Sequence, residues 1–322
     1  MGYYMGIDLG GTNIKAGVVD DAFRIIGRAK AKTGIPRPAE EVMDAMAECA
    51  KAAAADAGVP WEQIRQVGIG VPGTANEETG VVEYANNLLF ENVPMREYLQ
   101  KRLHKEIDIT NDANAAALGE VLAGAARGAS NAVAVTLGTG VGAGILHNGQ
   151  IYHGANGMAG EVGHMSIVYH GEPCPCGRRG CWERYASASA LKRLTARAME
   201  EHPGSILCRV VAENNGKVSG QSAFIAAREG DPVGQSVCDE YIGYLAAGVT
   251  NVVNIFQPDT LAIGGGVSNE SDEQLLLPLR RLVEQESIPC NRDKRTRIVK
   301  AQLGNNAGII GAALLGKRKL RK

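Results

Sequence analysis

The N-terminal part of the chain alternates short apolar runs with one long helical stretch. Tyr3 to Leu9 is a strand-like run that enters a glycine-rich turn, and Ile14 to Val19 leaves this turn as a second strand. Ala39 to Ala57 has apolar residues at helical spacing among many Ala, Glu and Met residues, which predicts a helix. Gln66 to Val71 predicts a further strand, and Pro72-Gly73 ends it as a turn.

The same kind of unit returns in the middle of the chain. Ala132 to Thr136 predicts a strand, Gly138 to Gly144 a second glycine turn, and Gly144 to His147 a returning strand. The strand, glycine turn, strand unit thus occurs twice, roughly 130 residues apart, which predicts two related α/β lobes.

The remaining elements follow from similar patterns. The sequence predicts a strand at Ile107 and Ile109, helices over Ala113–Ala126, Ala186–Glu200, Ser222–Glu229, Pro232–Phe256 and Ala307–Lys319, and a buried strand over Thr260–Ile263.

Length and composition agree with a two-lobed enzyme. At 322 residues the chain exceeds the size at which one core stops growing. A formal net charge of -1 and 21% charged residues give no reason to expect a nucleic-acid or membrane partner. The one basic run, Lys317 to Lys322, is expected to be a solvated helix end that complements the helix dipole.

The chain is expected to work in the cytoplasm. Asp8 stands where a signal peptide would be apolar, and no basic segment precedes it. The longest apolar run, Ala132 to Leu146, is too short and too rich in glycine to span a bilayer. Three of the seven cysteines are clustered, so the odd count fits reduced thiols and a metal site better than disulfides.

The strongest chemical signal is one histidine followed by three closely spaced cysteines. His164 precedes Cys174, Cys176 and Cys181, with Glu161 and Glu183 on either side. Thiolates and a neutral imidazole suit tetrahedral Zn²⁺, and four protein ligands leave no open position, so we expect a structural zinc site. The alternative of scattered reduced core cysteines suits Cys49, Cys208, Cys238 and Cys290, but not the cluster.

Both glycine turns offer groups that bind phosphate. Their glycines let the backbone approach an anion, and neighbouring amides and hydroxyls can donate to phosphate oxygens. Neither turn has the Walker spacing or the dinucleotide fingerprint, because a strand follows each of them. A glycine hairpin alone is more often only a tight turn. The candidate residues are Asp8, Gly10, Gly11, Thr12, Asn13 and Lys15 in the first turn, and Thr136, Gly138, Thr139, Gly140 and Gly142 in the second.

Asn111-Asp112 lies where a predicted strand gives way to a helix. This is a natural position for a catalytic base, although such a pair taken alone is more often an ordinary helix cap. Phosphoryl transfer to an alcohol needs phosphate donors, a divalent ion and an aspartate that accepts the hydroxyl proton. The glycine turns, the cluster and Asp112 together supply the residue types for that reaction.

The chain resembles the ROK family of sugar kinases, and within it the bacterial ATP-dependent glucokinases. The resemblance covers nearly the whole sequence. Its most specific element is Glu-x-Gly-His at 161–164 followed by Cys-x-Cys-Gly-x-x-Gly-Cys-x-Glu at 174–183. The supporting matches are Asp-Leu-Gly-Gly-Thr at 8–12, Thr-Asn-Asp-Ala-Asn at 110–114, Leu-Gly-Thr-Gly-Val-Gly at 137–142 and Ile-Gly-Gly-Gly-Val at 263–267.

The resemblance implies a fold and a division of the chain. The expected fold is the two-lobed actin and hexokinase-like (ribonuclease H-like) α/β ATPase fold with a zinc-binding insertion. Residues 1–110 and about 305–322 would form the smaller lobe, closed by the C-terminal helix. Residues 111–304 would form the larger lobe, with the zinc motif at 164–181.

The resemblance also assigns roles to residues. Asp112 would take the proton from the 6-hydroxyl of D-glucose, which then attacks the γ-phosphate of ATP to give glucose 6-phosphate. Both glycine turns would hold the ATP phosphates, with Gly264, Gly265 and Gly266 near the adenosine. Mg²⁺ would bridge the phosphates, and Asp8 would help to hold it. The residues expected around the sugar are Gly73, Asn87, Asn111, Asp112, Glu161, His164 and Glu183.

His164 then has two expected tasks. One imidazole nitrogen can bind zinc while the other bonds a sugar hydroxyl, so that the metal fixes the aim of the ring. Glu183, two residues past the last cysteine, would be positioned by the same site. The alternative for Glu161 and Glu183 is a pair of solvated loop carboxylates. A homo-oligomer, dimer or tetramer, is also expected.

Three other readings compete with a glucokinase. The loop Asn86 to Phe90 departs from the Pro-Asn-Leu and tryptophan of many relatives, so a kinase for another hexose, such as N-acetylmannosamine or allose, is the first alternative. ROK repressors carry a helix-turn-helix domain first, for which the early Asp8 leaves no room. An actin-like ATPase would not need the zinc and sugar motif.

Overall fold

A computed structural model describes residues 2–288 and 294–316. The chain divides into two compact units. Met1–Ala134, Gly144–Gly160 and Gln302–Lys322 form the first, and Val135–Ala143 and Glu161–Ala301 form the second. These units do not follow the expected boundary at residue 110, because the helix that begins at Asp112 packs within the first unit. As a division into lobes that close over substrates, that boundary stays a prediction.

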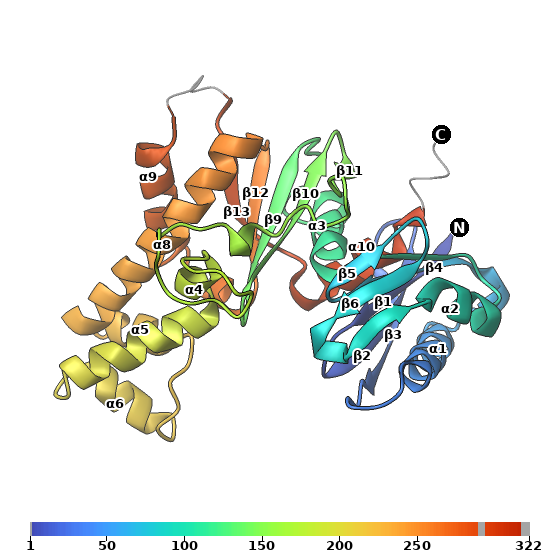
Figure 1. The fold of residues 1–322 in the computed structure, drawn as a ribbon, viewed down its shortest axis with the longest axis horizontal. Helices are drawn as coiled ribbons and strands as arrows, with labels where there is room; N and C mark the ends of the chain where they lie inside the picture. Colours follow the sequence, from blue (N-terminus) through green and yellow to red (C-terminus); the bar gives the residue numbers. More distant parts are fainter. Residues whose placement is uncertain (1, 289–293, 317–322) are drawn as a thin grey trace. The chain divides into compact units, whose positions relative to one another are not determined.

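The first unit is built on a five-stranded sheet with the order β3-β2-β1-β4-β8 (Figure 1). Strands β1 to β3 are antiparallel neighbours, whereas β4 pairs parallel with both β1 and β8. A small antiparallel sheet, β5-β6-β7, follows β4 in the chain. The strands are β1 Tyr3–Leu9, β2 Asn13–Asp20, β3 Ile25–Lys32, β4 Ile64–Val71, β5 Thr74–Asn76, β6 Val81–Ala85, β7 Phe90–Val93 and β8 Ile107–Asn111.

Helices cover both faces of this sheet. Met5, Ile7 and Leu9 of β1 share a buried core with α1, while Tyr4 packs with Ile309 of α10 on the opposite face. A Cβ on Gly6 of β1 would lie 1.9 Å from the carbonyl oxygen of Ile309, so glycine there lets α10 lie against the sheet. The helices of this unit are α1 Ala39–Asp56, α2 Met95–Leu103, α3 Asp112–Ala123 and α10 Ala307–Ala313.

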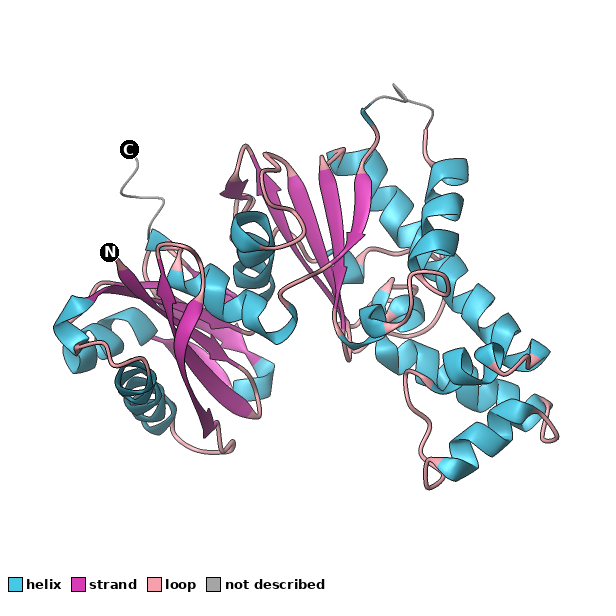
Figure 2. Cartoon of the chain, turned by 180° about the vertical axis from the view of Figure 1, so that it is seen from behind, coloured by secondary structure: helices cyan, strands magenta, loops and turns pink. Residues whose placement is uncertain are grey.

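A second five-stranded sheet has the order β11-β10-β9-β12-β13 (Figure 1). Its strands are β9 Ala132–Leu137, β10 Val141–His147, β11 Gln150–Ile151, β12 Thr260–Gly264 and β13 Arg297–Lys300. Most helices of the second unit follow one another in the chain between β11 and β12. Figure 2 draws all helices in cyan and the strands in magenta. They are α4 Glu183–Ala186, α5 Ala188–Glu201, α6 Ile206–Glu213, α7 Ser222–Arg228, α8 Pro232–Phe256 and, after β12, α9 Leu276–Glu286.

Helix α8 is the longest element of the second unit and anchors the end of the cysteine segment. Asp231 caps it by accepting a hydrogen bond from the amide of Val233, and Pro232 occupies its first turn. Trp182 is fully buried against α8 and donates from Nε1 to the carbonyl of Tyr244 at 2.9 Å. A Cβ on Gly248 would lie only 2.0 Å from the Trp182 ring, so the ring needs glycine there.

Three predicted helices have different bounds in the structure. The alanine-rich helix ends at Ala123 and not at Ala126, because Gly124 leaves helical backbone angles. The predicted Ala186–Glu200 helix corresponds to α5, which begins two residues later because Ser187 takes extended angles and caps it with its hydroxyl. Ala186 is instead the last residue of α4. The C-terminal helix ends at Ala313, whereas the predicted helix continued to Lys319. The end of that prediction lies in the basic run, residues 317–322, which is outside the described residues.

Several strands and helices were not predicted, and the second glycine turn is shorter than predicted. The second glycine turn is confined to residues 138–140, because β10 begins at Val141. Cys49 and Cys238 are buried as expected, Cys208 is half-buried, and Cys290 lies outside the described residues. In the described part of the chain, no helix has the length and apolar character needed to cross a membrane. The missed strands and α-helices are β3, β5, β6, β7, β11, β13, α2, α4, α6 and α9.

Glu120 joins α3 to the turn that precedes α10. Its buried carboxylate accepts backbone hydrogen bonds from Ala125 at 2.8 Å, Gln302 at 3.1 Å and Leu303 at 2.8 Å. We expect Glu120→Ala to lower the free energy of unfolding by about 3 kcal/mol or more, because three amides lose a charged acceptor. Urea denaturation measures this. Glu120→Gln keeps an acceptor oxygen and should cost less, so equal losses in the two variants would contradict the assignment.

Candidate functional site

The first glycine turn connects β1 to β2 and brings Asp8 beside Lys15. The two residues face each other across the hairpin, and Lys15 Nζ lies 3.2 Å from Asp8 Oδ2. Gly10 donates from its amide to the carbonyl of Asn13 at 2.9 Å, which closes the turn. Thr12 is exposed, and Gly11 and Asn13 are half-buried. The turn therefore presents a carboxylate and an ammonium group that already form an ion pair.

Asn111 and Asp112 mark the junction between β8 and α3. Asn111 is the helix cap, and its Oδ1 accepts hydrogen bonds from the amides of Ala113 at 2.9 Å and Asn114 at 3.4 Å. Its Nδ2 donates to the carbonyl of Gly73 at 2.9 Å, so two predicted site residues meet here. Asp112 is half-buried, and its Oδ1 accepts from the Ala113 amide at 2.8 Å. Asn111 is therefore the residue that caps α3, and the helix end does not depend on the Asp112 side chain.

Gly73 and Asn87 each lie close to another segment of the first unit. Gly73 has a φ of 87°, and a Cβ there would lie 2.1 Å from the carbonyl oxygen of Tyr84. Asn87 lies in a short 3-10 helix and is exposed. Its Cβ lies 3.3 Å from where a Cβ on Gly11 of the first turn would be. The first unit thus joins Asn87 to the first glycine turn, and joins Asn111 to Gly73.

The four predicted metal ligands meet in the second unit. The candidate ligand atoms of His164, Cys174, Cys176 and Cys181 all lie within 4.8 Å of one another. Cys176 and Cys181 have their sulfurs 3.7 Å apart, and Cys174 Sγ lies 3.8 Å from His164 Nδ1. Tetrahedral Zn²⁺ with bonds of the usual length would hold two sulfurs about 3.8 Å apart and a sulfur and a nitrogen about 3.6 Å apart. The donor set and the distances therefore fit zinc.

Protonation of the three thiols differs with their surroundings. Burial raises the pKa of Cys174 to about 12 and also raises the pKa of Cys181. Burial acts in the same direction on Cys176, but a backbone hydrogen bond at Arg178 and the two other thiols outweigh it and lower its pKa. Two protonated buried thiols beside a low-pKa thiol would need a bound cation to become three thiolates.

Glu183 lies between the metal cluster and the second glycine turn. Its Oε1 is 3.1 Å from Cys174 Sγ and 3.8 Å from His164 Nδ1. Its Oε2 faces Gly140, where a Cβ would lie 2.5 Å away. Glu161 lies on the other side of the ring, with Oε2 3.8 Å from His164 Nε2, and is more exposed than Glu183. One nitrogen of His164 thus faces sulfur and the other faces a carboxylate. The task of binding a sugar hydroxyl stays a prediction.

The third glycine segment lies against the second turn. Gly265 has a φ of 90°, and a Cβ there would lie 2.3 Å from the carbonyl oxygen of Leu137. In the second turn, Gly138 donates from its amide to the carbonyl of Gly140 at 3.0 Å, and Thr139 is exposed. The Thr136 hydroxyl donates to the carbonyl of Gly142 at 3.3 Å, so this hydroxyl closes the turn. The second unit therefore brings two of the three glycine segments together.

The predicted site residues are divided between the two units. The first holds Asp8 to Lys15, Gly73, Asn87, Asn111 and Asp112, and the second holds the other candidates. Arg228 and Glu270 were not predicted as site residues, and they form an ion pair just beyond the third glycine segment. They stand in ordinary polar stretches of the sequence, so the only available signal was that Glu270 follows the glycines closely.

Comparisons with known proteins agree with the motifs. The ROK family profile matches residues 4–319. A glucokinase of Halalkalibacterium halodurans is 35% identical, with 98% of this chain and 96% of that protein aligned. A crystal structure of a ROK family glucokinase from Streptomyces griseus, in complex with glucose and AMPPNP, has 34% identity and a TM-score of 0.82, covering 98% of this chain and all of that chain.

A relative of another functional class is nearly as similar. The xylose repressor of Caldicellulosiruptor bescii is 33% identical over 97% of this chain but only 77% of the repressor. Part of the repressor thus has no counterpart here, whereas the glucokinases match from end to end. With a profile match over almost all its residues and full-length relatives, this chain belongs to the ROK family.

Proposed function

We propose that this protein is an ATP-dependent kinase that phosphorylates the 6-hydroxyl of D-glucose. The observation that carries the proposal is the position of Glu183, whose carboxylate touches both the His164 and cysteine cluster and Gly140. A carboxylate suited to sugar hydroxyls and a glycine turn suited to phosphate therefore meet at one side chain. Full-length similarity to glucokinases selects glucose among the hexoses.

Asp112 is the proposed general base. Its carboxylate accepts the proton of the sugar 6-hydroxyl while that oxygen forms a bond to the γ-phosphorus and the bond to the ADP oxygen breaks. Asp112 stands on a rigid junction, because Asn111 caps α3 and is itself bonded to the carbonyl of Gly73. A base held on such a junction needs little reorganisation at the moment of transfer.

The sugar is proposed to be held by Asn111 in the first unit and by Glu161, His164 and Glu183 in the second, with Gly73 and Asn87 nearby. Carboxylates accept from hydroxyls, and a neutral imidazole with one nitrogen committed to a metal can donate from the other. When bound, Zn²⁺ supplies a closed structural centre, held by His164, Cys174, Cys176 and Cys181. Its proposed effect is to fix the orientation of His164.

The nucleotide is proposed to lie on the glycine segments. Backbone amides of the two glycine turns bind the phosphates, apart from those of Gly10 and Gly138, which donate within the turns. Gly264 to Gly266 approach the adenosine. When bound, Mg²⁺ neutralises charge on the β- and γ-phosphates. Asp8 can take part in holding this ion only if it loosens its pairing with Lys15, which is free to turn to a phosphate oxygen instead.

One assay tests the proposal directly. ADP release is measured with ATP and Mg²⁺ on glucose, mannose, N-acetylmannosamine, N-acetylglucosamine, allose and fructose. We expect glucose to give the highest kcat/KM. A higher value with another sugar would keep the kinase and change its substrate, which the exposed Asn87 loop makes the first alternative. No ADP release with any of the sugars would contradict the proposed function.

The similarity to a xylose repressor makes a sugar-responsive regulator the second candidate function. A sugar-responsive regulator would bind a sugar without turnover, and Asp112 would have no proton to accept. Glucose-dependent ADP release therefore separates the two functions in one measurement. The proposed homo-oligomer is tested separately, by the molar mass in solution.

A further inference from the structure

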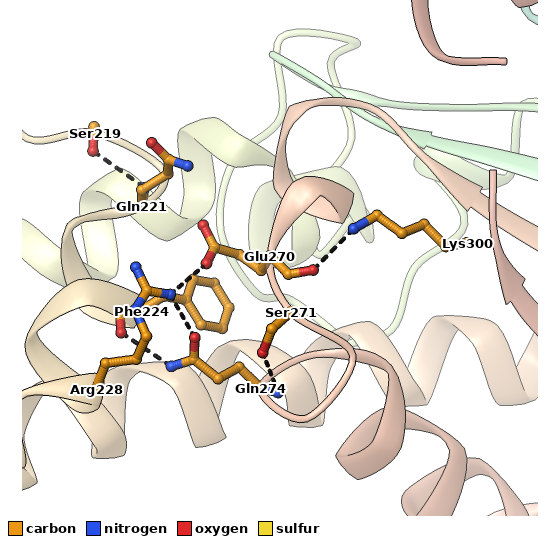
Figure 3. Close-up of polar contacts among 8 residues, drawn as sticks. All are labelled: Ser219, Gln221, Phe224, Arg228, Glu270, Ser271, Gln274 and Lys300. Atoms are coloured by element: carbon orange, nitrogen blue, oxygen red, sulfur yellow. Dashed lines mark hydrogen bonds and ion pairs between the residues drawn. The ribbon is translucent and has the colours of Figure 1, made fainter. Parts of the chain in front are cut away.

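Glu270 is a buried carboxylate directly behind the third glycine segment. It follows the short 3-10 helix Gly266–Asn269, and its side chain is only 3% exposed. Its backbone is held at both ends: its amide donates to the carbonyl of Val267 at 3.2 Å, and Lys300 Nζ donates to its carbonyl at 3.0 Å (Figure 3). The carboxylate therefore has a fixed place beside Gly264 to Gly266.

Among the described residues, only one of the two carboxylate oxygens of Glu270 has a hydrogen-bond partner. Oε2 accepts from Arg228 Nη1 at 2.9 Å, and the same Nη1 donates to Gln274 Oε1. Gln274 in turn donates from Nε2 to the carbonyl of Phe224 at 3.0 Å, which fixes the pair from α7. Oε1 is buried and accepts no hydrogen bond from the described residues. In Figure 3 this second oxygen points away from Arg228, to the side on which Gln221 is drawn.

An arrangement of this kind is expensive unless a ligand completes it. An ionised carboxylate loses its hydration on burial, and one partly exposed arginine only partly offsets that loss. A buried acceptor without a donor is a further destabilising feature. Such unsatisfied groups are few in native proteins, and a functional role is one recognised reason for them.

We propose that Glu270 recognises the adenine base of the nucleotide, because its Oε1 accepts a hydrogen bond from the 6-amino group. The inference rests on the proposed function, which brings adenosine to Gly264 to Gly266. Because Arg228 holds Oε2, the carboxylate offers one acceptor and not two. One acceptor suits the single amino group of adenine, whereas a guanine would present its 6-oxygen there and be repelled.

The surroundings of Oε1 fit a small planar donor. Phe224 is fully buried, and its backbone carbonyl anchors Gln274, which shares Arg228 with Glu270. Because Oε1 is itself buried from water, a charge-assisted hydrogen bond to it would be strong. Gln221 is exposed and precedes α7, so its side chain can turn aside and let the base reach Oε1. Gly266 has no atom within 4 Å of where its Cβ would be, which leaves room beside the loop.

The test compares ATP with ITP, which carries an oxygen in place of the 6-amino group. In Glu270→Gln the amide oxygen can stay with Arg228, which leaves an N–H group where Oε1 was. That group opposes adenine and favours hypoxanthine, so we expect the ratio of kcat/KM for ATP over ITP to fall at least about tenfold. Glu273→Gln, an exposed neighbour in the same segment, is the matched control and should leave the ratio unchanged.

Binding measurements make the test independent of turnover. Calorimetric Kd values for ADP and IDP should shift in the same way, even for a protein that phosphorylates none of the sugars, so the two proposals fail separately. Should Glu270→Gln not fold, Glu270→Asp keeps the charge, retracts the oxygen and should also lose the preference. A folded Glu270→Gln protein with an unchanged ratio would overturn the inference. Equal losses for ATP and ITP with no loss for 2′-deoxy-ATP would place the contact at the ribose and overturn it as well.

Discussion

Replacing Asp112 by asparagine should reduce kcat for glucose by about 10²- to 10⁴-fold, the usual contribution of a general base. The amide has the shape of the carboxylate but cannot accept the 6-hydroxyl proton. The contact from the Ala113 amide to Oδ1 survives, because an amide oxygen accepts it equally well. Asn111, not Asp112, caps α3, so the helix end is unaffected. Glucose Kd should therefore stay within a few-fold of the wild-type value.

Two measurements separate this loss from a general defect. Single-turnover phosphate transfer reports the chemical step, and glucose Kd reports the sugar site. Asp44→Asn is the matched control, because Asp44 is an aspartate of the same unit that pairs with Arg102 at the surface. Asp44→Asn should keep the wild-type kcat. A kcat for Asp112→Asn within threefold of the wild type would remove Asp112 from the mechanism.

Local signals explain which elements the sequence predicted well. Helix α8 has the predicted bounds, because Asp231 and Pro232 are start signals and the apolar pattern runs unbroken to Phe256. The predicted C-terminal helix was too long, since Leu314 already leaves helical backbone angles after Ala313. The small sheet of β5 to β7 was missed because its strands are short and show little alternation.

The candidate site was predictable where it depends on short spacing. His164 and the three cysteines lie within one chain segment, so residue types and spacing were enough to predict that they meet. The contact between Glu183 and Gly140 joins segments distant in sequence, and only the packing of the fold brings them together. The same holds for Arg228 and Glu270, whose pairing depends on how α7 packs beside the segment after β12.

Removing the metal should weaken glucose binding by about 10- to 100-fold and leave ATP binding within about threefold. Without zinc, the orientation of the His164 ring is no longer fixed, and Glu183 no longer has an ordered His164 beside it. One or two charge-assisted hydrogen bonds to the sugar are therefore lost. Chelation of the purified protein and the variant Cys176→Ser should act alike, because Cys176 supplies one of the four ligand atoms. Elemental analysis should find one zinc per wild-type chain and less in the variant.

Cys208→Ser is the matched control, since Cys208 belongs to the second unit but not to the cluster. It should bind zinc, glucose and ATP like the wild type. The comparison of the two ligands is decisive because Glu183 touches both the cluster and Gly140. If metal loss simply unfolded this segment, the second glycine turn would be disturbed too and ATP affinity would fall with glucose affinity. A selective loss of glucose binding means that zinc aims His164 and Glu183 at the sugar, and unchanged glucose binding in zinc-free protein would rule out that coupling.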